Sequence, residues 1–281
     1  MKKCLFAVFA CLLLMFSCTG NKVRQDVAVS VDSVDSNSVD STEMMDTLEL
    51  LITETPMPRA ADAMFDDFIF NFVANKKLQK ERIVFPLRRT ESGKTIQIDK
   101  SKWQMEHFFM RQGYYTLLFN DDSQMELMKD TAVNEAIVEK IYLDEKKVED
   151  YLFQRIRGAW MMKEVKVTPL EDNPHGSFLT FYQHFATDSA FQMKSLTPTV
   201  QFVGPDPEDD FNQMEGLITP DTWEAFAPEL PTGLLYNIIY GKPQHEGNEK
   251  IFLIRGVANG YELELHFKKT VGKWLLAKMI T

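Results

Sequence analysis

The amino-acid sequence predicts an α+β protein built from two similar units, each with helices first and an antiparallel sheet last. Two observations predict this class. Several segments recur in the same order along the chain, and in each copy a helical apolar spacing gives way to strict alternation. Helices that precede a run of strands usually pack on one face of the antiparallel sheet. The 281 residues also exceed what one average domain needs, which fits two modest cores.

The first recurring segment is helical. FDDFIFNFVANKKLQ, which starts at Phe65, aligns with FLTFYQHFATDSAFQ, which starts at Phe178. Phenylalanines recur at spacings of three and four in both copies, which indicates a helix with one apolar face. A second segment pairs Trp103 with Trp223, and each tryptophan follows a capping-box pattern that predicts a short helix.

The later recurring segments are strands. EKIYL at 139–143 recurs as EKIFL at 249–253, and a Gly-x-Trp motif pairs Trp160 with Trp274. YELELHFKK alternates apolar and polar residues after an Asn-Gly turn signal, so each copy is expected to end in three antiparallel strands. The polar stretches GPDPEDDFNQ and NDDSQMELMKD, where the alignment shifts, are expected to be loops.

The paired FxxFxxxF patterns and the later Gly-x-Trp motifs resemble the nuclear transport factor two-like superfamily, a cone-shaped (cystatin-like) α+β fold. They are similar to a family of uncharacterised bacterial envelope lipoproteins with this fold in tandem. The resemblance implies a first repeat at 60–170 and a second at 174–281. Its motifs consist mostly of packing residues, so it implies a fold and no particular activity.

The N-terminus carries the pattern of an export signal. Two lysines precede an apolar run that is too short to span a membrane, and LMFSC then resembles a lipobox. We therefore expect a lipoprotein signal peptide at 1–17, lipidation of Cys18 and a disordered acidic tether at 18–59. These features predict a lipid-anchored envelope protein of a Gram-negative-type bacterium, on the outer membrane facing the periplasm. Secretion without a lipid on Cys18 is the alternative.

Composition argues against several classes of function. The net charge of -10, with no concentrated basic patch, disfavours nucleic acid as a partner. All three cysteines lie at or before Cys18, so the body has no disulfide, thiolate metal site or cysteine nucleophile. No metal, cofactor or catalytic residue is expected.

Four residues are weak candidates for a pocket. His184 and Asp188 are one helical turn apart and could form an acid-base pair, while Asp66 and Tyr114 are residue types that ketosteroid isomerase chemistry requires. The sequence favours a non-catalytic module that binds a protein partner or a small apolar or glycan ligand. The alternative is a small-molecule isomerase or hydrolase with a pocket in one cone. A third possibility is an assembly role for a groove around 172–176.

The lipid anchor is directly testable. The change Cys18→Ala should leave the exported protein unlipidated while its body still folds, because Cys18 precedes the predicted repeats. Mass spectrometry of the purified protein and its partition into detergent measure this. A lipidated Cys18→Ala protein would contradict the assignment.

Overall fold

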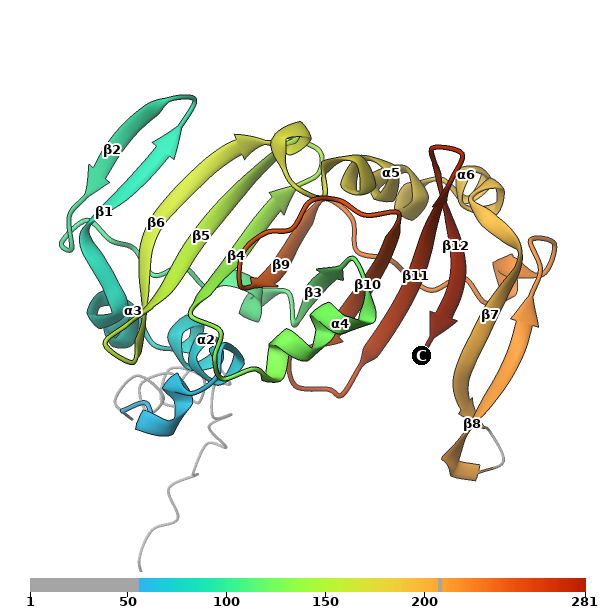
Figure 1. Ribbon diagram of the computed structural model, residues 1–281, viewed down its shortest axis with the longest axis horizontal. Coiled ribbons are helices and arrows are strands. Elements are labelled where there is room, and N and C mark those ends of the chain that lie inside the picture. Colours follow the sequence, from blue (N-terminus) through green and yellow to red (C-terminus); the bar gives the residue numbers. More distant parts are fainter. Residues whose placement is uncertain (1–55, 207–208) are drawn as a thin grey trace, which may run out of the picture. The chain divides into compact units, whose positions relative to one another are not determined.

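The computed structural model describes residues 56–206 and 209–281, and all of the described strands belong to one sheet (Figure 1). The sheet has 12 strands in the order β2-β1-β6-β5-β4-β9-β3-β10-β11-β12-β7-β8. It is mixed, and the described helices are few and short. None of these helices is long and apolar enough to cross a membrane. The expected signal peptide, Cys18 and nearly all of the expected tether lie outside the described residues.

The N-terminal half, residues 56–169, begins with helices and ends with three strands. Its elements are η1 (Arg59–Asp62), α2 (Phe65–Ala74), α3 (Lys76–Arg82), β1 (Ile83–Glu91), β2 (Lys94–Ile98), η2 (Phe108–Arg111), β3 (Tyr114–Phe119), α4 (Asp122–Met125), η3 (Glu126–Lys129), β4 (Glu135–Tyr142), β5 (Lys147–Ile156) and β6 (Ala159–Pro169).

The C-terminal half, residues 170–281, follows a similar order. Its elements are η4 (Leu170–Asp172), α5 (Gly176–Thr187), α6 (Ser189–Lys194), β7 (Leu196–Asp206), β8 (Asp209–Ile218), η5 (Trp223–Ala225), β9 (Leu234–Tyr240), β10 (Glu249–Gly256), β11 (Glu262–Thr270) and β12 (Lys273–Ile280).

Strands β3 and β9 are exchanged between the halves. Strand β9 of the C-terminal half pairs antiparallel with β4, and β3 of the N-terminal half pairs antiparallel with β10. The two exchanged strands meet in parallel at Thr116 and Asn237, where the Thr116 hydroxyl donates to the Tyr236 carbonyl at 3.1 Å. Each half is thus completed by a strand from the other.

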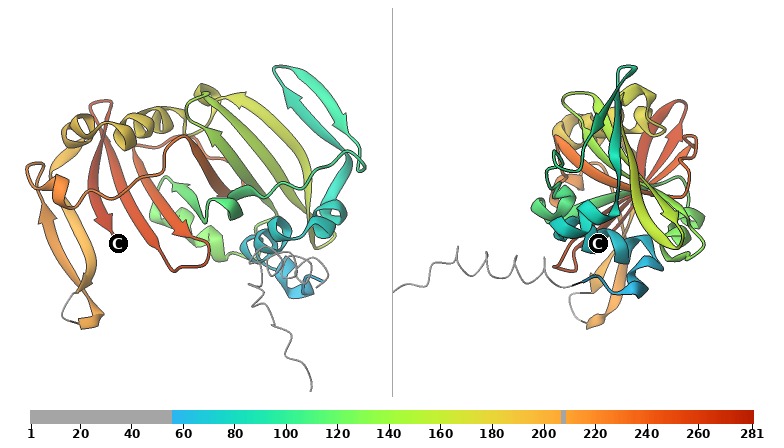
Figure 2. Two further views of the ribbon diagram at one scale, coloured as in Figure 1. Left: turned by 180° about the vertical axis from the view of Figure 1, so that it is seen from behind. Right: turned by 90° about the vertical axis from the view of Figure 1, so that its left-hand side faces the viewer.

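The exchanged strands contribute to two apolar cores. Successive strand residues point to opposite faces, so Tyr115, Leu117 and Phe119 enter one core while Leu118 enters the other. The first core contains the buried phenylalanines of α2, and the second contains those of α5. Figure 2 shows α5 and α6 near β7 and β12, apart from α2 and α3. The middle of the sheet is therefore buried on both faces.

A glutamine holds the recurring tryptophan in each half. Trp103 Nε1 donates to Gln79 Oε1 at 3.1 Å, and Trp223 Nε1 donates to Gln192 Oε1 at 2.8 Å. Trp223 opens the short helix η5 as expected, but the helix expected at Trp103 is absent. The reason is local: Gln79 also bonds the backbone N–H and carbonyl of Glu106 and holds this segment extended.

Two expected loops are regular structure. The described residues of GPDPEDDFNQ, 204–206 and 209–213, lie in β7 and β8, which pair as a hairpin at the edge of the sheet. NDDSQMELMKD contains α4 and η3, because the Asp121 carboxylate accepts from Gln124 N at 3.2 Å and caps α4.

The EKIYL and EKIFL segments are not counterparts in the sheet. Asp150 lies as many residues before Trp160 of β6 as Glu264 lies before Trp274 of β12, so these two positions correspond. Their partners across the sheet are Glu139 and Leu253. Leu253, rather than Glu249, therefore takes the place of Glu139. The likeness of the two pentapeptides is a coincidence of two apolar strands.

Removing the Gln192 side-chain acceptor should destabilise the C-terminal half. Gln192→Leu leaves the buried Trp223 N–H without a partner, which costs about 1–3 kcal/mol of unfolding free energy. Urea denaturation followed by circular dichroism measures this. Gln97→Leu, on the exposed edge strand β2, is the matched control and should change the unfolding free energy by less than about 0.5 kcal/mol. Equal effects would contradict the anchoring role.

Candidate functional site

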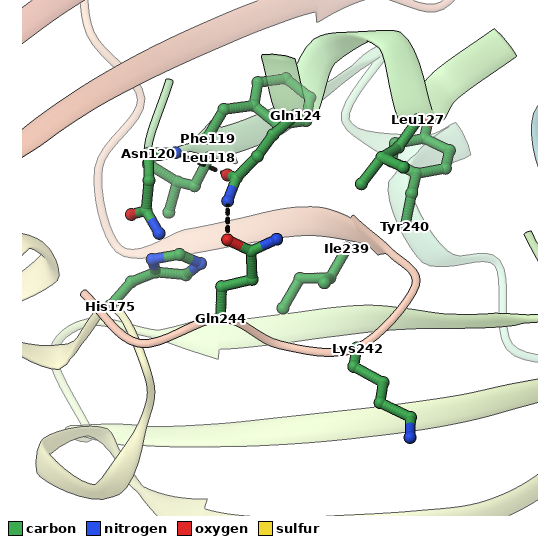
Figure 3. A pocket seen from close by; sticks show the side chains of 10 residues that line it. All are labelled: Leu118, Phe119, Asn120, Gln124, Leu127, His175, Ile239, Tyr240, Lys242 and Gln244. Carbon is green, nitrogen blue, oxygen red and sulfur yellow. Dashed lines mark hydrogen bonds between the residues drawn. The ribbon is translucent and has the colours of Figure 1, made fainter. Parts of the chain in front are cut away.

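The centre of the sheet encloses a polar cavity too small for a ligand. Its volume is about 20 Å³, which is room for about one water molecule. Gln124 Nε2 donates to Gln244 Oε1 at 2.5 Å across it (Figure 3). His175 and Asn120 lie on one side of this pair, and Tyr240 and Leu127 lie on the other.

A buried lysine lies beside this cavity. Lys250 is 0% exposed, and its ammonium donates to Asn120 Oδ1 and, at 2.9 Å, to His175 Nδ1. Burial lowers the pKa of Lys250 to about 8. Burial, and then the Lys250 charge, lower the pKa of His175 to about 3, so the imidazole is neutral and can accept the bond. This contact ties the start of α5 to β10.

A buried carboxylate joins the halves at the exchanged strand β9. Glu139 is 1% exposed, and it accepts from Asn173 Nδ2 at 2.5 Å and from Asn237 Nδ2 at 2.6 Å. Burial raises the pKa of Glu139. Burial, and then the charge of Glu139, raise the pKa of its cross-strand neighbour Asp150 to about 8. Both Glu139 oxygens bond amides of this chain, which indicates a structural role.

The segment 172–176 connects the two halves, and two of its side chains are buried. Asn173 and His175 are buried because they bond Glu139 and Lys250. Gly176 is equally constrained, since a Cβ there would lie 2.5 Å from the Leu170 carbonyl oxygen. The Asn173 and His175 side chains are thus used inside the molecule, while Asp172 remains exposed.

Asp66 meets a tyrosine, but not the expected one. The Tyr240 hydroxyl donates to Asp66 Oδ1, and burial raises the pKa of Asp66 against the effect of this bond. Tyr240 faces the cavity of about 20 Å³, which has no room for a substrate. Sequence reasoning missed Tyr240 because LLYNIIY was not recognised as a strand, although its apolar run was a usable signal.

His184 and Asp188 have separate roles. The exposed His184 ring lies 5.7 Å from the Phe191 ring centroid and lines a groove between α5, α6 and β12. The Asp188 carboxylate instead caps α6, where it accepts from Phe191 N at 3.0 Å. Within the described part of the chain, the His184 and Asp188 side chains form no hydrogen bond or ion pair with each other.

Tyr114 lines the largest hollow among those described, which we call the tyrosine hollow. Its volume is about 750 Å³. The Tyr114 hydroxyl accepts from Gln112 Nε2 at 2.8 Å, which leaves its own proton available to a ligand. Burial raises the pKa of both Tyr114 and Tyr261, so both are phenols at neutral pH. The lining residues are Gln112, Gly113, Tyr114, Pro228, Glu229, Leu230, Pro231, Ile254, Gly256, Asn259, Tyr261, Leu263 and Thr281.

The corresponding part of the N-terminal half is filled. The alignment of Trp103 with Trp223 places Phe108 and Phe109 opposite Pro228 and Glu229. Phe108 is 1% exposed and packs on Tyr151 with ring centroids 4.8 Å apart, while Phe109 is 0% exposed. The tyrosine hollow is thus lined by Pro228 and Glu229, which align with these two buried phenylalanines.

Metal binding has no support in residues 56–206 and 209–281. No group of three or more His, Cys, Asp or Glu side chains there is arranged to hold a metal ion.

Comparison with known proteins identifies related sequences and a related structure. Residues 44–281 match a family model described as "Domain of unknown function (DUF4348)". The crystal structure of an NTF2-like protein, BF2862, from Bacteroides fragilis NCTC 9343 is 38% identical, with a TM-score of 0.72. The match covers 80% of this chain and 98% of that one, so the α+β fold is of the NTF2-like type. No curated protein matches the sequence.

The raised pKa of Asp150 predicts a pH-dependent stability. The pKa of Asp150 is about 8 in the folded protein and 3.8 by its ordinary value, so the group loses its proton at lower pH in the unfolded chain. Its contribution to stability is therefore greatest at low pH and falls between about pH 4 and pH 8. Each pH unit in that window costs up to about 1.4 kcal/mol. Asp150→Asn should therefore stabilise the protein more at pH 7.5 than at pH 4.5.

Urea denaturation at the two pH values measures this difference. Asp122→Asn, at an exposed carboxylate, is the control and should give the same change at both. A pH-independent effect of Asp150→Asn would contradict the perturbed ionisation.

Proposed function

Because the chain belongs to the DUF4348 family and has the NTF2-like fold, we propose that it is a non-catalytic envelope protein that binds a small ligand in the tyrosine hollow. The observation that carries this proposal is the open volume of about 750 Å³ where the N-terminal half has buried phenylalanines. Ligand sites in proteins commonly enclose about 300–1,000 Å³.

The lining defines the class of ligand. Leu230, Ile254 and Leu263 supply apolar surface, and the Tyr114 hydroxyl supplies a proton for an acceptor. Glu229, together with the acidic net charge, disfavours an anion here. The ligand is a neutral molecule with an apolar body and at least one hydrogen-bond acceptor.

The competing function, an isomerase or hydrolase, has weaker support. Glu229 carries the one carboxylate side chain among the lining residues, and this side chain is exposed to solvent. The buried carboxyl groups with raised pKa values, Asp66, Glu139 and Asp150, do not line the hollow. A base of the kind that such chemistry requires is therefore not positioned at the ligand.

The architecture supports an internal duplication as part of this proposal. The repeats are 60–170 and 174–281, and their β3 and β9 strands are exchanged. Support comes from the matching order of elements and from the two Trp–Gln bonds.

The proposed cellular location is based on the sequence pattern of the N-terminus. Lipidation of Cys18 after removal of residues 1–17 would anchor the protein to the outer membrane of a Gram-negative-type bacterium, facing the periplasm. The segment 18–59 would then act as a spacer between the lipid and the body. The partners are the membrane, through this lipid, and the small ligand or an unidentified protein, and not nucleic acid.

Binding of a neutral apolar probe tests the hollow. N-phenyl-1-naphthylamine should bind with saturable fluorescence enhancement, and Leu230→Trp, which fills the hollow, should reduce its affinity about tenfold or more. A second variant tests the hydrogen bond: Tyr114→Phe removes the donor, so an acceptor-bearing probe such as 2-acetylnaphthalene should bind to it about five- to tenfold less tightly. Tyr142→Phe, in the N-terminal half, is the control and should leave the binding of this probe unchanged. Full probe binding to Leu230→Trp would overturn the proposal.

A further inference from the structure

A second open site lies between α5, α6 and the start of β12, and we call it the lysine groove. Its volume is about 550 Å³. Three lysines line it, Lys194, Lys269 and Lys273, and none of its lining residues is acidic. The lining residues are Ser177, Thr180, Phe181, His184, Phe191, Lys194, Ser195, Lys269, Gly272, Lys273, Trp274 and Leu275. Such a concentration of cations is unexpected in a chain with a net charge of -10.

The N-terminal half holds a carboxylate of its own at the corresponding place. Asp62 Oδ1 accepts from Trp160 N at 3.0 Å and from Arg82 Nη1 at 2.9 Å, and Asp62 Oδ2 accepts from Arg82 Nη2 at 2.8 Å. The carboxylate therefore bridges the end of α3 and the start of β6. Arg155 completes this site, with its guanidinium 4.9 Å from the Trp160 ring centroid.

The sheet registers show that the two places correspond. Arg82 precedes Ile83, which pairs with Met162, and Ser195 precedes Leu196, which pairs with Leu276. The paired residues each lie two positions after a tryptophan, Trp160 or Trp274. The tryptophans also share their contacts, since Trp160 meets Phe65 at 4.9 Å and Trp274 meets Phe178 at 5.4 Å between ring centroids.

The C-terminal half keeps one of the two cations of this place, because the register puts the neutral Ser195 where Arg82 stands. Lys269 takes the position of Arg155, and its ammonium lies 5.1 Å from the Trp274 ring centroid. The alignment of Phe65 with Phe178 places His175 opposite Asp62, but His175 bonds Lys250 in the middle of the sheet. The residue aligned with Asp62 therefore does not enter the groove. A different carboxylate, that of Glu246, accepts from Ser177 Oγ beside the groove and from Phe178 N at 3.0 Å.

Two of the three lysines that line the groove form no ion pair with another described residue. Lys269 bonds Glu246 at 3.3 Å, whereas Lys194 and Lys273 form no ion pair within the described residues. Phe181 and Phe191, with ring centroids 5.7 Å apart, line the same groove and are partly exposed. An occupant thus meets aromatic faces beside two free ammonium groups.

We propose that the lysine groove binds a small aromatic carboxylate, whose carboxyl group takes the place that Asp62 fills in the N-terminal half. Lys194 and Lys273 supply positive charge to the carboxyl group, and the phenylalanines and Trp274 pack against the aromatic body. This site is separate from the tyrosine hollow and has the opposite preference for charge.

Isothermal titration calorimetry with 2-naphthoate on the full mature protein tests the site. 2-Naphthoate should bind about tenfold or more tightly than its neutral analogue 2-naphthamide, and also more tightly than inorganic phosphate. The double change Lys194→Gln and Lys273→Gln should weaken 2-naphthoate binding about tenfold. Both lysines are exposed, so the variant is expected to fold, and circular dichroism verifies this.

Two controls separate the groove from other causes. Lys76→Gln with Lys77→Gln removes the same charge from exposed positions of α3 and should keep the affinity for 2-naphthoate within about twofold. Leu230→Trp, in the tyrosine hollow, should also leave it unchanged. Equal binding of naphthoate and naphthamide, tightest binding by phosphate, or undiminished binding by the Lys194 and Lys273 variant would each overturn the proposal.

Discussion

The exchange of β3 and β9 is the constraint on which the rest of the structure depends. Because each strand completes the sheet of the other half, both of its faces must be buried, and two cores form on opposite faces of the same strands. This arrangement also explains the buried charges. Glu139 and Lys250 lie in the strands that receive the exchanged partners, and amides or an imidazole satisfy them there. Buried charged groups persist only where such partners are fixed.

The two halves have a similar order of helices and strands but different side chains at the positions that form the open sites. In the N-terminal half, Phe108 and Asp62 fill the two places that are open in the C-terminal half. The lysine groove is lined by the C-terminal half, and the tyrosine hollow is lined by that half together with Gln112, Gly113 and Tyr114.

Local patterns predicted much of the fold and little of the sites. The phenylalanine spacing predicted α2 and α5, and alternation predicted β11, because these signals depend on neighbours along the chain. The exchange of β3 and β9 depends on pairing between distant segments, which no local pattern encodes. The two open sites depend on differences between the halves. Pro228 and Glu229 align with Phe108 and Phe109, and His175 aligns with Asp62. Tyr114 and His184 were selected as candidates and do line them, but the partner of Asp66, Tyr240, lies on a strand that sequence reasoning missed.

Native-state hydrogen exchange in increasing urea, read by mass spectrometry, tests the exchanged sheet most directly. The pairs β4–β9 and β3–β10 join the two halves, so the whole sheet should open as one cooperative unit. The amides of β5 and β11, which lie in different halves, should then lose protection at the same urea concentration. Loss of protection in β10 to β12 at a clearly lower urea concentration than in β4 to β6 would show two independent domains. That result would contradict the account.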